Sequence, residues 1–150
     1  MKSNIEIYGN VRIVSYDLQG RVISQQAVHN LVPSTGLDLI LNRLLSTGTA
    51  LVPHHFTFGT GTTAAYSTDT GLQSSAYDIS FTTPSVAAAE VTFNGSVYST
   101  DGVGSTWNEI GIFTSSSSLV ARALIAPLIK TSSSPTNELI AWSFDLVATT

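Results

Sequence analysis

The chain has 150 residues, the usual size of one domain, and no cysteine, which excludes disulfides, thiolate nucleophiles and thiolate metal sites. Only 11% of the residues are charged, 43% are hydrophobic and the net charge is −4, with six scattered Lys and Arg, so the clustered cations of a nucleic-acid groove are missing. No stretch approaches the ~18 apolar residues of a membrane span, and the amino-terminal MKSNIEIYGN alternates polar and apolar residues, unlike a secretory signal. We therefore expect one domain over residues 1–150, without nucleic-acid or membrane partners, whose surface packs against neighbouring proteins.

The first thirty residues predict a β-meander. Apolar residues at even spacing over residues 5–13 indicate one face of a strand, with a bulge or bend at Gly9 and Asn10. Residues 17–20, DLQG, place Asp and Gly at the first and fourth positions of a type I turn. A second strand should therefore follow this turn and run to about His29.

Residues 35–46 change to a helical period. An i, i+3, i+4, i+7, i+8 stripe follows Pro33 and consists of Leu37, Ile40, Leu41, Leu44 and Leu45. Ser34 or Thr35 is the candidate N-cap, and Gly48 ends the segment. The pattern predicts an amphipathic helix that covers a sheet, and a partner-binding face is the alternative.

The middle of the chain predicts short strands separated by polar connections. Residues 54–58 indicate a strand, and the small and hydroxyl-bearing residues up to Ser75 predict a long surface loop with one helical turn at residues 70–73. Alternating patterns predict strands at residues 77–81 and 91–97, joined by residues 84–89.

Residues 107–127, WNEIGIFTSSSSLVARALIAP, have the clearest pattern and predict a hairpin. Two apolar-rich runs, 107–114 and 119–126, flank the polar connection 115–118. Symmetric closure of that connection pairs residues whose numbers sum to about 233. The predicted pairs are Phe113 with Val120, Gly111 with Arg122, and Glu109 with Leu124.

Glu109 and Arg122 then lie diagonally on one face of the hairpin. The same face would also carry Trp107 and Phe113, so a carboxylate among aromatic rings has an arginine within reach. We predict a structural ion pair between Glu109 and Arg122, and a catalytic Glu109 is the alternative.

Residues 138–148 predict a last strand with a strongly apolar face. The sequence as a whole predicts a mainly β protein, an antiparallel β-sandwich of about eight or nine short strands with one amphipathic helix near residues 35–46.

No pattern in the chain predicts catalysis, a cofactor or a metal. Gly59 and Gly61 follow a strand, but the third glycine, the following helix and the lysine of a phosphate-binding loop are missing. His54 and His55 are adjacent in a strand and should point to opposite faces, which is poor geometry for a shared metal. There is no G-x-S-x-G motif, and the acidic residues are dispersed. We therefore expect a protein that is not an enzyme, with no catalytic, cofactor-binding or metal-ligating residue.

Four aromatic residues are candidate ligand or interface residues. They are Tyr66, Tyr77, Tyr98 and Trp107. Exposed aromatic rings stack on sugars, so a glycan-binding module for host attachment is the alternative from another functional class. A place in the core is the default expectation for most of these rings.

Several segments resemble a family of tailed-bacteriophage virion proteins. They are HNLVPSTGLDLILNRLL, then FTFGTGTTAAYSTDTGLQSSAYDISF, then NEIGIF, LVARALI and LIAWSFDL. An N-L-V…G helix, a G-T-G-T…D-T-x-L loop and an E-I-G-I/L-F strand occur in that family in this order, and the last two are similar to the tail-collar region of tail fibres. Where fibres carry Glu and Arg after the loop, this chain has Ser74, Ser75 and Tyr77, and we expect no fibre shaft after Thr150.

The resemblance implies a non-enzymatic virion structural protein, a small tail or baseplate component that assembles through repeated contacts with copies of itself and with other virion proteins. A capsid cement protein that decorates and stabilises the lattice of the major capsid protein is the alternative. Either would be assembled in the bacterial host cytoplasm and located in the virion, with a host glycan as a further candidate partner.

Overall fold

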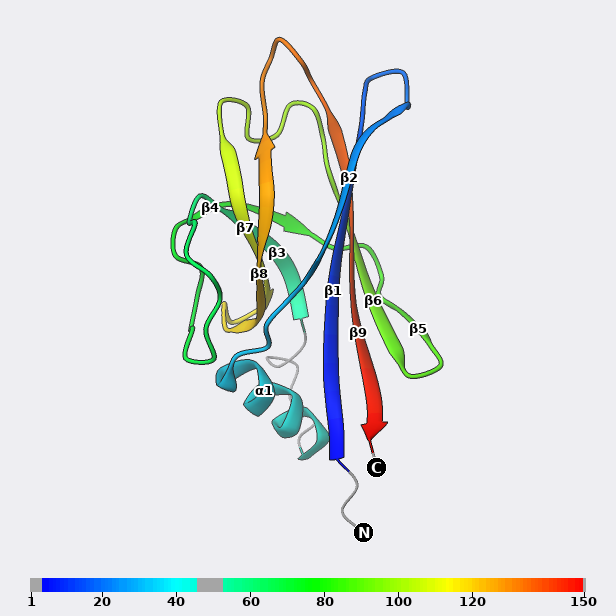
Figure 1. Ribbon diagram of the computed structural model, residues 1–150, viewed down its shortest axis with the longest axis vertical. Helices are drawn as coiled ribbons and strands as arrows, with labels where there is room; N and C mark the ends of the chain where they lie inside the picture. Colours follow the sequence, from blue (N-terminus) through cyan, green and yellow to red (C-terminus); the bar gives the residue numbers. More distant parts are fainter. Residues whose placement is uncertain (1–3, 46–52, 150) are drawn as a thin grey trace.

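The computed structural model describes residues 4–45 and 53–149, and in these residues it contains nine strands in two antiparallel sheets and one short helix (Figure 1). The first sheet has the order β2-β1-β9-β6-β5, with bounds Val22–His29, Asn4–Tyr16, Asn137–Thr149, Glu90–Val97 and Ser85–Ala87. The second has the order β4-β3-β7-β8, with bounds Ser75–Ser80, Pro53–Gly59, Thr106–Thr114 and Leu119–Ile129. The helix α1 spans Ser34–Leu45. The mainly β, sandwich-like fold expected from the sequence is confirmed.

The two ends of the described chain lie side by side in the first sheet. β1 pairs with β9 from Asn4 opposite Thr149 to Tyr16 opposite Asn137 without a register shift, so both termini lie at one end of the molecule (Figure 1). The bulge expected at Gly9 and Asn10 is therefore absent. The side chain of Asn30 occupies the space that a Cβ at residue 9 would need, so this glycine allows a close approach and not a bend.

The hydrophobic core fills the space between the inner faces of the two sheets. Aromatic rings from both sheets stack there: Phe56 lies 5.9 Å from Trp142, and Phe58 lies 4.5 Å from Trp107, between ring centroids. Each such ring is 0% exposed, and burying a side chain of this size contributes about 1.5–3 kcal/mol. Aliphatic residues complete the core, among them Val11, Ile13, Ile110, Ile112 and Ile140.

The helix α1 packs against β8 at the end of the sandwich that holds the termini (Figure 1). A Cβ at Gly36 would overlap the carbonyl oxygen of Val120, so the helix approaches the strand backbone closely at this residue. This contact sets the rotation of the helix, with Leu39 packed against the core and Leu37 and Leu41 exposed by 41% and 58%. The prediction that Leu37 and Leu41 face the sheet is therefore wrong, and Leu44, Leu45 and Gly48 lie outside the residues whose side chains are described.

Two local expectations are corrected and one is confirmed. β5 forms within the stretch expected to be a connection, because the chain turns back at Ala88, whose φ is 53°, and pairs with β6. The helical turn expected at residues 70–73 is absent, because backbone amides of this loop bond to a buried carboxylate described below. The turn at residues 17–20 is present, and the Gly20 N–H donates to the Asp17 carbonyl at 3.0 Å.

Candidate functional site

The hairpin of β7 and β8 has the predicted register at its centre and a different register at both ends. Glu109 faces Leu124 and Gly111 faces Arg122, as expected. Phe113 faces Leu119 instead of Val120, because the register shifts between Ile112 and Phe113. The predicted pairing of Phe113 with Val120 is therefore wrong.

A second shift lies between Trp107 and Glu109 and changes which way Trp107 points. The Trp107 ring stacks on Phe58 at 4.5 Å and on Tyr77 at 5.5 Å in the core. The expectation that Trp107 shares a face with Glu109 is wrong, because a bulge moves the following side chains to the other face of the strand.

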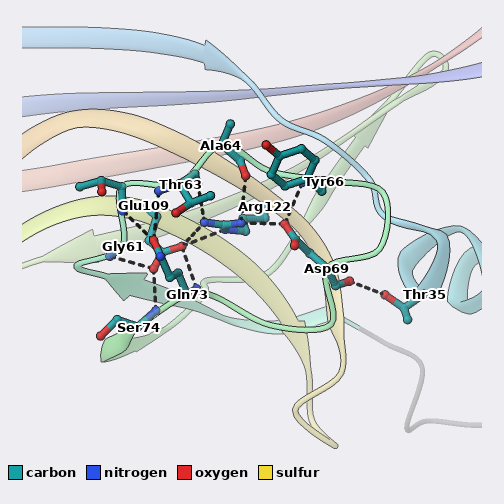
Figure 2. Close-up of polar contacts among 11 residues, drawn as sticks. Thr35, Gly61, Thr63, Ala64, Tyr66, Asp69, Gln73, Ser74, Glu109 and Arg122 are labelled. Atoms are coloured by element: carbon teal, nitrogen blue, oxygen red, sulfur yellow. Dashed lines mark hydrogen bonds and ion pairs between the residues drawn. The ribbon is translucent and has the colours of Figure 1, made fainter.

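Glu109 is fully buried beneath the loop 60–74, which folds over the outer face of the second sheet. Figure 2 shows that the carboxylate receives hydrogen bonds from this loop and from Arg122. One oxygen accepts from the amides of Gly61 at 3.0 Å and Ser74 at 2.9 Å, and the other accepts from the Gln73 amide at 3.1 Å and from Arg122 Nε at 2.8 Å. The lone pairs of this carboxylate are therefore occupied by the protein itself.

Arg122 is 3% exposed and uses every nitrogen of its guanidinium. Nε and Nη2 contact Glu109 at 2.8 Å, Nη1 donates to Asp69 at 2.7 Å, and Nη2 also donates to the Thr63 carbonyl at 2.7 Å (Figure 2). Its backbone exchanges hydrogen bonds with Leu31, in the segment that precedes α1. One arginine thus joins β7, β8, the loop 60–74 and the chain before the helix.

Asp69 completes this network at its more exposed side. Burial opposes ionisation of Asp69, but the hydrogen bond from the Tyr66 amide and the contact with Arg122 outweigh burial and hold the pKa of Asp69 below its usual value of 3.8. The aspartate is therefore ionised at neutral pH, and its side chain is 20% exposed. The arrangement is a hydrogen-bonded group of two carboxylates and one guanidinium.

A second buried ion pair, which the sequence analysis missed, joins Lys130 to Glu138 at 2.7 Å. The ammonium also donates to the carbonyls of Tyr98 at 3.1 Å and Thr136 at 2.6 Å, and the Thr136 hydroxyl bonds to the other oxygen of Glu138. Exposure is 1% for Lys130 and 0% for Glu138. The sequence signal that could have indicated this pair is a single charged residue at one end of each of two apolar runs, LIK and ELIAW.

The two networks share a repeated tetrapeptide, Tyr-Ser-Thr-Asp, at residues 66–69 and 98–101. In each copy the tyrosine amide donates to the aspartate side chain, at 2.9 and 2.8 Å, and the aspartate amide donates to the tyrosine carbonyl at 3.0 Å. One turn contacts Arg122 through Asp69, and the other contacts Lys130 through the Tyr98 carbonyl. A search for short repeats would have indicated both turns from the sequence.

The candidate aromatic residues separate into core and surface. Trp107 is 0% exposed and its Nε1 is a buried donor without a hydrogen-bond partner among the described residues, so the structure corrects its assignment as a candidate surface residue. Tyr77 is partly buried, and its hydrogen bond with Asp101 raises the pKa of its phenol above the usual value of 10.0. Tyr66 and Tyr98, on the twin turns, are exposed by 59% and 65% and can contact a partner.

The residues considered for metal or phosphate binding make other contacts in the structure. The rings of His54 and His55 lie 5.6 Å apart, so the expectation of opposite faces is wrong, because the register of β3 shifts between Pro53 and His55. Among the described residues, no three His, Asp or Glu side chains gather as a metal site. The Gly61 amide, which a phosphate-binding loop would direct to an anion, is bonded to Glu109.

An apolar hollow of about 360 Å³ lies at the end of the sandwich near the termini, between Ile7 of β1, Ile40 of α1 and Phe144 of β9. Within the described part of the chain, no helix is long and apolar enough to cross a membrane.

Comparison of the chain with protein-family models, with curated proteins and with solved structures finds no match.

Proposed function

We propose that this chain is a non-enzymatic structural protein of a tailed-bacteriophage virion, a small tail or baseplate component. The observation that carries the proposal is the full use of the buried charges inside the fold. Glu109, Arg122, Lys130 and Glu138 each bond to protein groups. Glu109 and Arg122 hold the loop 60–74 against the sandwich, and Lys130 bonds to the carbonyls of Tyr98 and Thr136 in two other connections. Such groups stabilise one conformation and have no free position for a substrate.

The surface supports repeated protein contacts. Only 11% of the residues are charged, so contacts between copies would desolvate few charges. Large hydrophobic side chains are exposed on several elements, among them Val22, Ile23, Val86 and Ile129. A particle of closed symmetry uses the same contact many times, so these properties suit a virion component.

The test is the position of the protein on an intact particle. Antibodies against the chain, visualised with gold on purified virions, should label the tail or the baseplate. Label distributed over the head would replace this proposal with the capsid cement alternative. Purified virions that contain none of the chain would contradict both, and particles lacking the gene product provide the control for antibody specificity.

The glycan-binding alternative depends on Tyr66 and Tyr98, which two identical turns present at the surface. If the protein binds a glycan through stacking, Tyr66→Ala or Tyr98→Ala should abolish the signal on a glycan array and leave the unfolding midpoint unchanged. Tyr8→Ala is the matched control, because Tyr8 is 48% exposed in a strand far from both turns in sequence. A wild-type chain without any array signal would exclude this alternative.

A further inference from the structure

A polar hollow of about 350 Å³ lies beside the contact of Asp69 with Arg122. The loop 60–74 supplies all of its described walls except Arg122, which comes from β8. Hydrogen bonds from three amides of this loop to the buried Glu109 hold the loop in one conformation. Sites that bind small molecules usually measure roughly 300–1,000 Å³ and are largely formed before the ligand arrives. The hollow therefore has the size and the fixed walls of a small-molecule site.

Two side chains that line this hollow keep polar atoms available for a ligand. Asp69 uses Oδ2 for the Tyr66 amide and for Arg122, and its Oδ1 has no hydrogen-bond partner among the described residues. Gln73 accepts from two backbone amides of the loop through Oε1, at 2.9 and 3.0 Å, which fixes the direction of its carboxamide. The Gln73 Nε2 group then has no partner in the described part of the chain. The hollow thus offers one acceptor and one donor.

These groups suit a neutral ligand that carries several hydroxyl groups. Arg122 is neutralised by two carboxylates, so it has no charge to spare for a phosphate group. The Asp69 carboxylate is paired with Arg122, so a cation would find no set of unpaired carboxylates here. An acceptor beside a donor matches neighbouring hydroxyls of a sugar, and the Tyr66 ring, 59% exposed, can stack on the C–H face of the same sugar. The chemistry of the hollow is therefore that of a saccharide site.

A second polar hollow, of about 360 Å³, extends this surface toward α1. Thr70 borders both hollows, and Asp38 and Asn42 line the second one from the helix. The Thr35 hydroxyl donates to the Asp69 carbonyl at 3.3 Å, so the helix is joined to the loop beside this surface (Figure 2). Two hollows with a common border have room for more than one sugar ring. The ligand that fits them is an oligosaccharide.

The twin turn at residues 98–101 lacks these features, although its tyrosine is equally accessible. Asp101 bonds to the Tyr98 amide at 2.8 Å and also to the Tyr77 phenol, so less of its accepting capacity is left for a ligand. The hollow beside this turn contains neither a carboxamide nor an arginine among its described residues. The same tetrapeptide therefore provides a control within the same chain.

We propose that the hollow lined by Tyr66, Asp69 and Gln73 binds a ring of a neutral oligosaccharide. Tyr66 stacks on the ring, Asp69 accepts hydrogen bonds from its hydroxyls, and Gln73 donates to them. This inference goes beyond the proposed structural role, and it assigns the ligand to the first turn alone, whereas the glycan-binding alternative uses both turns. Its test is made on the purified chain, so its failure is distinguishable from a failure of the particle labelling.

The first experiment measures binding of the purified chain to an array of neutral mono- to hexasaccharides from bacterial surface polysaccharides, followed by calorimetric titration of the strongest ligand. Tyr66→Ala should weaken binding about tenfold or more, because the stacked ring is lost, and Tyr66→Phe should retain most of the affinity. Tyr98→Ala is the matched control and should bind as the wild type does, since Tyr98 is 65% exposed on the identical turn. A wild-type chain that binds no sugar on the array, or equal weakening by Tyr66→Ala and Tyr98→Ala, would overturn the proposal.

The second experiment tests the polar contacts by calorimetry with the same ligand. Gln73→Glu keeps an oxygen for the two loop amides but replaces the N–H₂ donor with a second oxygen, so it should weaken binding and leave the unfolding midpoint unchanged. Gln25→Glu, which introduces the same charge on β2, is the control and should not affect binding. Asn42→Ala should weaken binding of the oligosaccharide but not of a single sugar, because Asn42 lines only the second hollow. Unchanged affinity in Gln73→Glu would refute the assignment of the ligand to this hollow.

Discussion

The buried contact between Glu109 and Arg122 yields the sharpest stability prediction, a double-mutant cycle with Glu109→Gln, Arg122→Met and both changes together. Glu109→Gln directs a side-chain N–H₂ toward groups that are themselves donors, since both carboxylate oxygens accept hydrogen bonds. Arg122→Met leaves the Glu109 charge fully buried and removes the donors to Asp69 and to the Thr63 carbonyl. We expect each single change to cost about 3–5 kcal/mol, with Arg122→Met the larger.

The double variant should lose less than the sum of the single losses. Once both charges are absent, neither leaves an uncompensated partner in the core, so the coupling energy should be about 1.5–3 kcal/mol. The measurement is urea unfolding followed by the fluorescence of the two buried tryptophans, with a constant m-value as the check on two-state behaviour.

Arg21→Met is the matched control for this cycle. Arg21 contacts Asp17 at 2.7 Å, but its side chain is 77% exposed, so its loss should leave the unfolding midpoint almost unchanged. If the Glu109 and Arg122 changes prove additive within about 0.5 kcal/mol, the reasoning that the two charges stabilise the fold as a pair is refuted.

Three further predictions concern the neighbouring parts of the fold. The pKa of Asp69 is lower in the folded chain than its usual value of 3.8, so the ionised side chain stabilises the fold above pH 3.8. This stabilisation is lost as the pH falls below 3.8. The unfolding free energy of Asp69→Asn should therefore decrease less steeply with acid than that of the wild type. An identical acid dependence would show that Asp69 does not contribute. Trp107→Ala should cost about 3–5 kcal/mol in chemical unfolding, and a stable variant that had lost only ligand binding would contradict its place in the core. Lys130→Met should destabilise by about 3–5 kcal/mol because it leaves the Glu138 charge buried, and Lys130→Met combined with Glu138→Gln should recover part of this loss in the same assay.

The sequence by itself determined the elements whose signals are local. Alternation of apolar residues predicted most of the strands, the helical period predicted α1, and the spacing of Asp17 and Gly20 predicted the first turn. The register at Gly111 and Arg122 also followed from the sequence, because four connecting residues between two apolar runs leave few ways to close a hairpin. These features depend on residues close together in the chain.

Only the tertiary structure decided which distant segments meet. The pairing of β1 with β9 joins the two ends of the described chain, and no local pattern indicates it. The bulge beside Trp107 reverses the face of a side chain, and a bulge depends on the partner strand and the core that the side chain fills. The sequence predicted the loop 60–74 as an exposed polar connection, yet three of its backbone amides donate hydrogen bonds to Glu109, because a buried carboxylate takes its hydrogen bonds from whichever backbone the fold brings to it.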